Sequence, residues 1–167
     1  VGSQDWMQTA LLARAAGIDP RQLRYVAMEG GGELATSLLG GHIHVASTDI
    51  SDSVPHIESG GIRILAILSD ERLPGDSVAD IPTAKEQGYD VSWPVIRGFY
   101  MGPDVSDEDY AWWKNTFEEV LASDDYATLR EQRELFPFSM TGDELDTYVK
   151  KQVAQYKQLA SEFGLTQ

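Results

Sequence analysis

The amino-acid sequence predicts an α/β fold in which helices flank a mainly parallel sheet. Between residues 4 and 68, helical patterns of apolar residues alternate with short apolar runs, and such runs are typical of parallel strands covered on both faces. With 167 residues and 42% hydrophobic content, the chain can bury one sizeable core or two small lobes. No apolar run approaches the roughly 20 residues that a membrane-spanning helix needs.

The first predicted element is a helix over residues 4–16, which Gly17 ends. Apolar residues recur in it at helical spacing: Met7, Ala10, Leu11, Leu12 and Ala13. Because a strand normally precedes such a helix in an α/β protein, we expect that strand to lie upstream of Val1.

The next predicted pair is a buried strand over residues 23–28 and a helix over residues 33–39, closed by Gly40 and Gly41. Three glycines separate the strand from the helix. Glycines at such a junction let a ligand approach the backbone, and the N–H groups of a helix start favour an anion. The alternative is that the glycines only form a tight turn. The spacing matches neither G-x-G-x-x-G nor a loop ending in G-K-[ST], so nucleotide binding is not favoured.

A second pair follows, with an alternating strand over residues 42–47 and a short helix over residues 52–59. Residues 62–68 are almost continuously apolar and predict a further buried strand. Residues 69–88 are rich in turn formers and predict one short helix over residues 83–87. The strand-like segment 91–101 contains Pro94, which argues against a central position in a sheet and suits a crossing between two lobes.

The last third of the sequence is helical. Ser106 and Asp109 mark one helix start, followed by an apolar face made of Tyr110, Trp113, Phe117, Val120 and Leu121. Thr141 and Glu144 predict a capping box for a long final helix that Gly164 ends.

Composition excludes several classes of function. The net charge of −14 opposes binding to nucleic acid and to anionic membrane surfaces. The absence of cysteine excludes disulfides, thiolate metal sites and a cysteine nucleophile.

Catalytic and metal chemistry find little support. His42 and His44 share a strand face near Asp49, but this spacing alone is weak evidence for a metal site, and an exposed strand face is the simpler interpretation. The candidate nucleophiles Ser3, Ser37, Ser47 and Ser51 lie in no G-x-S-x-G motif and have no evident base. We therefore expect no catalytic residue, no metal and no cofactor.

Three predicted loops follow the carboxyl ends of parallel strands, over residues 2–5, 29–32 and 48–52. In open α/β sheets such loops converge on the ligand crevice. Three helix starts aimed at one cleft would present many N–H donors and hydroxyls, which suits a carboxylate.

Longer stretches of the sequence resemble a known family. These stretches are GIDPRQLRYVAMEGGGELATSLLGGHI, ESGGIRILAILSDERLPG, DIPTAKEQGYDV and RGFYMGP. In order and spacing, over nearly the whole chain, they resemble the substrate-binding receptors of tripartite tricarboxylate transporters, the TctC-like or Bug family of periplasmic receptors.

The resemblance implies a type II periplasmic binding protein fold with two lobes that close on a small carboxylate. Family members are about twice this length, and this chain resembles their carboxyl-terminal half. Residues 1–92 resemble most of the second lobe, and residues 93–167 resemble the return strand and the helices that pack on the first lobe, which is largely missing.

The resemblance also implies a set of ligand-binding residues. The family loop G-[ST]-x-D-H corresponds to residues 2–6, with Trp6 in place of histidine, and Arg97 follows Ile96 where the family has tryptophan. Glu29 is an acid where the family usually has a small or basic residue. Arg97 is a bidentate carboxylate partner or a structural ion pair at the lobe crossing. The full set is Gly2, Ser3, Gln4, Asp5, Gly30, Gly31, Gly32, Thr48, Asp49 and Arg97.

The function implied is that of a periplasmic receptor that captures a di- or tricarboxylate, without catalysis, and delivers it to the membrane permease subunits of the transporter. The alternatives are a subunit that presents the ligand to a membrane signalling protein, or an α/β hydrolase. Apolar helix faces around Trp112, Trp113 and Phe117 would lack a cover in such a fragment, so a dimer is also expected.

Overall fold

The computed structural model describes residues 3–133 and 135–165. The chain forms two compact units, Val1–Val95 and Ile96–Gln167. The assignment of residues 1–92 and 93–167 to receptor lobes stays a prediction.

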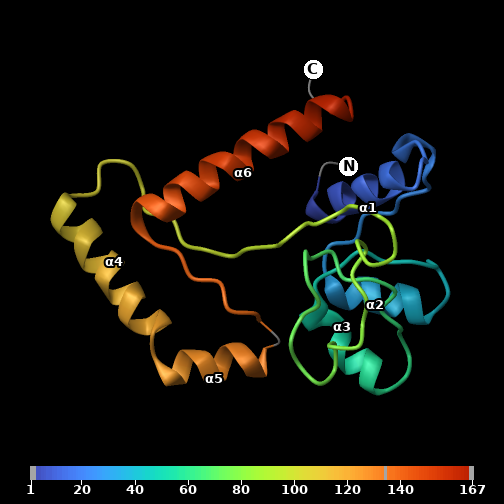
Figure 1. Ribbon diagram of the computed structural model, residues 1–167, viewed down its shortest axis with the longest axis horizontal. Coiled ribbons are helices and arrows are strands. Elements are labelled where there is room, and N and C mark those ends of the chain that lie inside the picture. Colours follow the sequence, from blue (N-terminus) through green and yellow to red (C-terminus); the bar gives the residue numbers. More distant parts are fainter. Residues whose placement is uncertain (1–2, 134, 166–167) are drawn as a thin grey trace. The chain divides into compact units, whose positions relative to one another are not determined.

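The first unit contains helices α1 (Gln4–Ala15), α2 (Gly31–Leu39) and α3 (Ile50–Glu58) and the short 3-10 helix η1 (Pro20–Gln22), which are labelled in Figure 1 except for η1. The Ser3 side chain caps α1 by accepting a hydrogen bond from the Trp6 N–H at 3.3 Å. The predicted apolar stripe of α1 is buried at Met7, Ala10 and Ala13. The helices predicted over residues 4–16, 33–39 and 52–59 are therefore confirmed, and α2 begins two residues before the expected start, within the glycines.

The prediction of a hydrogen-bonded parallel sheet is wrong for the described residues. Among the described residues, the one β-pairing is a parallel bridge between Ile67 and Thr83. Central residues of the predicted strands are exposed rather than buried, with exposed fractions of 50% for Val26, 71% for Val45 and 54% for Leu65. A strand is stable only when a neighbouring strand accepts and donates its backbone hydrogen bonds, and apolar periodicity cannot supply that neighbour. The strand-like segments are extended chain without a ladder.

Residues 69–95 complete the first unit and contribute the deeply buried side chains of Val78, Thr83 and Ala84 to its core. The short helix expected over residues 83–87 is a turn instead. In that turn the Thr83 N–H donates to Glu86 Oε2 at 2.8 Å and the Glu86 N–H donates to Thr83 Oγ1 at 3.1 Å. The two residues thus form the reciprocal bonds of a capping box without a helix following them.

The second unit contains α4 (Asp107–Leu121), α5 (Asp124–Gln132) and α6 (Gly142–Glu162) (Figure 1). Ser106 caps α4 as expected, because its Oγ accepts from the Asp109 N–H at 3.1 Å. Phe99 and Phe117 stack with their ring centroids 5.0 Å apart, and Trp113 lies 5.9 Å from Phe117. The sequence analysis did not predict α5, although Ser123 caps it by accepting from the Tyr126 N–H.

The capping box predicted for α6 does not form. Thr141 is the N-cap residue, but its side chain makes no capping bond. The hydroxyl instead donates to Glu118 Oε1 at 2.5 Å, which ties the start of α6 to α4. None of the helices in residues 3–133 and 135–165 is long and apolar enough to cross a membrane.

Candidate ligand-binding site

The starts of α1 and α3 lie close together in the first unit. Asp5 is in the first turn of α1, Asp49 is the N-cap of α3, and Asp52 is in the first turn of α3. Partial burial raises the pKa of Asp5 above its ordinary value, and the negative charges of Asp49 and Asp52 raise it further. The start of α1 is therefore within electrostatic reach of the start of α3.

The start of α2 meets the start of α3 through Gly31. A Cβ atom built on Gly31 would lie 2.4 Å from Asp52 Oδ2, 2.5 Å from its Cγ and 2.9 Å from its Cβ. The backbone of Gly31 does not adopt a left-handed conformation, so glycine is needed here for close approach and not for its φ angle. The starts of α2 and α3 are therefore in contact, and the start of α1 lies within electrostatic reach of α3.

The space beside Gly30 and Gly32, which flank Gly31 at the start of α2, is open. A Cβ built on Gly30 or Gly32 would have no atom within 4 Å. Gly30 is the N-cap of α2 and offers no side chain to cap it, while the Glu33 carboxylate accepts from the Glu29 N–H at 2.9 Å. Within the described part of the chain, no protein acceptor is recorded for the N–H groups of Gly31 and Gly32. These two donors are placed to bind an anion.

Two further side chains join these loops to their surroundings. The Ser47 hydroxyl donates to Gln8 Oε1 at 2.6 Å, and Gln8 is 5% exposed. The hydroxyls of Ser3 and Tyr25 lie 3.5 Å apart. Sequence reasoning named neither Gln8 nor Tyr25 for this region. Gln8 could have been noticed because it lies three residues after Asp5, on the same face of α1.

The structure brings together only part of the expected site. Ser3, Asp5, Gly30, Gly31, Gly32 and Asp49 lie at the three helix starts, with Gln4 on α1 and Thr48 directly before the α3 cap. Gly2 lies outside the described residues. Arg97 belongs to the second unit, on an exposed extended segment. The ligand roles of all these residues stay predictions.

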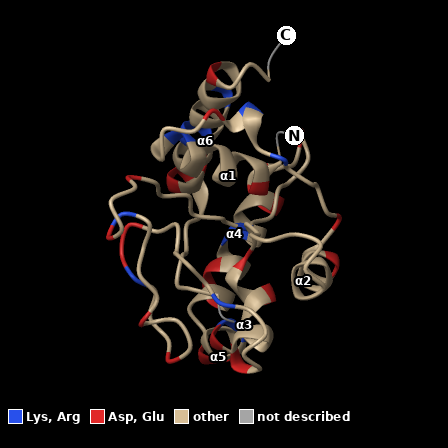
Figure 2. Ribbon diagram, turned by 90° about the vertical axis from the view of Figure 1, so that its right-hand side faces the viewer, with Lys and Arg blue, Asp and Glu red and all other residues tan. Residues whose placement is uncertain are grey.

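Acidic residues outnumber basic ones and occur both on the helices and on the connecting segments (Figure 2). In the first unit Arg21 pairs with Asp19 at 2.9 Å, Arg72 with Glu86 at 2.9 Å, and Lys85 with Asp70 at 2.8 Å. No group of three or more histidine, aspartate or glutamate residues in the described ranges could hold a metal ion. The expected donors at this site are thus backbone and hydroxyl groups.

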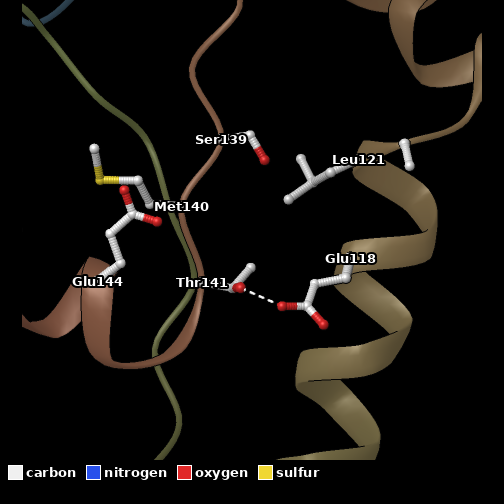
Figure 3. A pocket seen from close by; sticks show the side chains of 7 residues that line it. Glu118, Leu121, Ser139, Met140, Thr141 and Glu144 are labelled. Carbon is white, nitrogen blue, oxygen red and sulfur yellow. Dashed lines mark hydrogen bonds between the residues drawn. The ribbon is translucent and has the colours of Figure 1, made fainter.

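A separate depression of about 290 Å³ lies in the second unit, between α4 and the segment before α6 (Figure 3). Its lining consists of Glu118, Leu121, Ala122, Ser139, Met140, Thr141 and Glu144. Glu118 accepts from Lys114 Nζ at 2.6 Å and from Thr141, and these bonds lower the pKa of its carboxyl group. Two carboxylates with one cation already engaged do not suit an anionic ligand, so the helix starts of the first unit are the better candidate.

Comparison with known proteins gives a consistent result. Residues 2–165 match the family described as the tripartite tricarboxylate transporter family receptor. No curated protein sequence matches this chain significantly.

Two solved structures share the fold, each at 20% sequence identity. The structure described as R. palustris Rpa4515 with adipate has a TM-score of 0.77 and is matched over 97% of this chain and 53% of that protein. A TctC solute binding protein from Polaromonas, without ligand, has a TM-score of 0.72 over 96% of this chain and 54% of that protein. The chain therefore spans about half the length of these structures.

Proposed function

The chain belongs to the tripartite tricarboxylate transporter receptor family, and from this premise we propose that it is part of a periplasmic receptor that binds a small organic dicarboxylate. Its partners would be the permease subunits of such a transporter, and it would work by binding without catalysis. One structure that shares its fold is described as holding adipate, a linear dicarboxylate.

The observation that carries this proposal is the contact between the starts of α2 and α3, with the start of α1 within electrostatic reach. Among the described residues, no protein group accepts a hydrogen bond from the Gly31 or Gly32 N–H. Helix N-termini bind anions because their first N–H groups are unsatisfied and their dipoles favour negative charge. Ser3 and Thr48 would add hydroxyl donors, and Gln4 an amide.

The test is calorimetric titration of the 167-residue chain with adipate, succinate and citrate. Stoichiometric binding of at least one of them, with no product formed, is expected. Ser3→Ala should weaken binding by about 0.5–1.5 kcal/mol if the hydroxyl makes one neutral hydrogen bond to the ligand.

Ser123→Ala is the matched control for Ser3→Ala. Both serines are N-caps that accept one backbone hydrogen bond, at 3.3 Å for Ser3 and 3.2 Å for Ser123, but Ser123 caps α5 in the second unit. Equal affinities of the two variants would remove Ser3 from the site. Absence of heat and of any chemical-shift change with all three acids, from a chain shown to be folded, would contradict the proposed function.

A further inference from the structure

The segment that leads into α3 is joined to α1 by one side-chain hydrogen bond. Residues 45–48 belong to no helix or strand and make no backbone hydrogen bond with any other residue that the structure describes. The Ser47 hydroxyl donates to Gln8 Oε1 at 2.6 Å, across 39 positions of the sequence. A segment without a ladder has few other bonds to hold it in place. The Ser47–Gln8 bond is therefore the directional contact between this segment and α1.

Gln8 is a polar residue on the buried face of α1. Its side chain is 5% exposed, and the helix also buries Trp6, Met7 and Ala10. A buried amide needs a hydrogen-bond partner, whereas a methionine would fill a similar volume without one. Glutamine at this position thus favours the arrangement in which a donor of the neighbouring segment faces its carbonyl oxygen. The bond specifies a contact that apolar packing alone would leave free to slide.

The Ser47–Gln8 bond lies beside residues that the proposed function assigns to the ligand. Thr48 directly follows Ser47 and precedes Asp49, the N-cap of α3, while Gln4 lies one turn before Gln8 on α1. A donor that is held in place before the ligand arrives adds more affinity than one that must be ordered on binding. Holding Ser47 on α1 consequently holds the backbone of Thr48 relative to the start of α1.

We propose that Gln8 is a positioning residue of the ligand site, which acts through Ser47 to hold Thr48 where its hydroxyl meets a small dicarboxylate. This inference rests on the proposed function. Gln8 needs no contact with the ligand in this role. Loss of the Ser47–Gln8 bond should therefore weaken binding even in a variant that keeps its stability.

The experiment compares binding with stability in the wild type, Gln8→Met and the double variant Ser47→Ala/Gln8→Met. Each protein is titrated with adipate, succinate and citrate at a temperature at which it is folded, and its free energy of unfolding is measured in urea. The double variant leaves no buried group without a partner, so its stability should stay close to that of the wild type. Its affinity, and that of Gln8→Met, should nevertheless fall about two- to tenfold, the scale of one neutral hydrogen bond.

Ser59→Ala is the matched control. The Ser59 hydroxyl donates to the backbone carbonyl of His56 at 3.0 Å, at the other end of α3. This variant also removes a serine hydroxyl beside α3, but far along the helix from Thr48, and should leave the dissociation constant unchanged.

A measurement without ligand tests the positioning itself. The order parameter of the Thr48 amide, measured by NMR relaxation, should be lower in the double variant than in the wild type. An equal order parameter in the two proteins would show that the Ser47–Gln8 bond does not hold this segment.

The outcomes separate the two proposals. Binding by the wild type with an unchanged dissociation constant in Gln8→Met and in the double variant would overturn the positioning role and leave the proposed function in place. An equal loss of affinity in Ser59→Ala would also overturn it. Absence of binding of all three acids by the wild type would contradict the proposed function and the positioning role with it. Weaker binding by the double variant at wild-type stability, with a lower order parameter at Thr48, would support both.

Discussion

Gly31 and Gly32 are neighbours in the first turn of α2, and alanine at these two positions should have opposite effects on stability. A Cβ on Gly31 would overlap the side chain of Asp52, whereas a Cβ on Gly32 would meet nothing within 4 Å. Neither glycine has a left-handed backbone. The comparison therefore isolates the effect of packing at the helix start.

The expected magnitudes follow from these distances. Ordinary van der Waals contact begins near 3.4 Å, and the Gly31 position is 2.5 Å from Asp52 Cγ and 2.9 Å from its Cβ. Rotation of the Asp52 side chain moves Cγ but not Cβ, so α2 and α3 must also separate slightly. Such overpacking costs about 1–3 kcal/mol. Gly32→Ala should instead stabilise the chain by about 0.4–1 kcal/mol, because alanine loses less conformational freedom on folding.

The assay is urea unfolding of the wild type, Gly31→Ala, Gly32→Ala and the double variant Gly31→Ala/Asp52→Ala. The double variant should recover part of the loss, since only the Cβ overlap remains. If Gly31→Ala proved as stable as Gly32→Ala, then Asp52 would not pack on α2, and the convergence of the helix starts argued from it would be refuted.

Three other predictions can be measured with the same unfolding assay. Ser47→Ala should destabilise the chain by about 1–3 kcal/mol because it leaves the buried Gln8 carbonyl without its donor. The double variant Ser47→Ala/Gln8→Met should be nearly as stable as the wild type. An equal loss of stability in the single and the double variant would contradict this explanation. Asp5 has a pKa raised by burial and by two nearby carboxylates, so its charge opposes folding: the unfavourable effect is absent below the unfolded pKa and grows as pH rises through the folded pKa. Asp5→Asn should therefore be more stable than the wild type near neutral pH and lose this advantage near about pH 3. If the difference in unfolding free energy between the two proteins did not change with pH, the charge of Asp5 would not be its cause. Ser106→Ala should cost about 0.5–2 kcal/mol by removing the cap of α4, and an unchanged midpoint would show that the cap is dispensable.

The helices could be predicted because their signals are local. Ser3 and Ser106 cap the helices that follow them, and the buried positions of α1 repeat at the expected spacing. The α6 capping box failed for a reason that no local pattern contains, since Thr141 bonds instead to Glu118, 23 residues earlier. The strand predictions were wrong for a similar reason. The apolar run at residues 62–68 does not specify a partner strand, and without a partner no ladder of hydrogen bonds forms.

The contact between two of the expected loops could be predicted from the sequence, whereas the ligand site itself stays a prediction. The rule that loops at strand ends converge indicated the three helix starts. Gly31 does contact Asp52 of α3, and the charges of Asp49 and Asp52 act on Asp5. The sequence could not show why Gly31 is a glycine, because the reason is a side chain 21 residues later. Nor could it show that Gln8 is buried against Ser47, which depends on how α1 packs.

An acidic chain that binds an anion needs donors whose effect is short-ranged. The net charge of −14 gives no long-range attraction to a carboxylate. In the first unit, Arg21, Arg72 and Lys85 each pair with an acidic side chain of the chain itself. Backbone N–H groups at helix starts provide attraction only within the first turn, where they outweigh a distant field. An anion held in this way would be sensitive to every charge beside it, including those of the aspartates at the starts of α1 and α3.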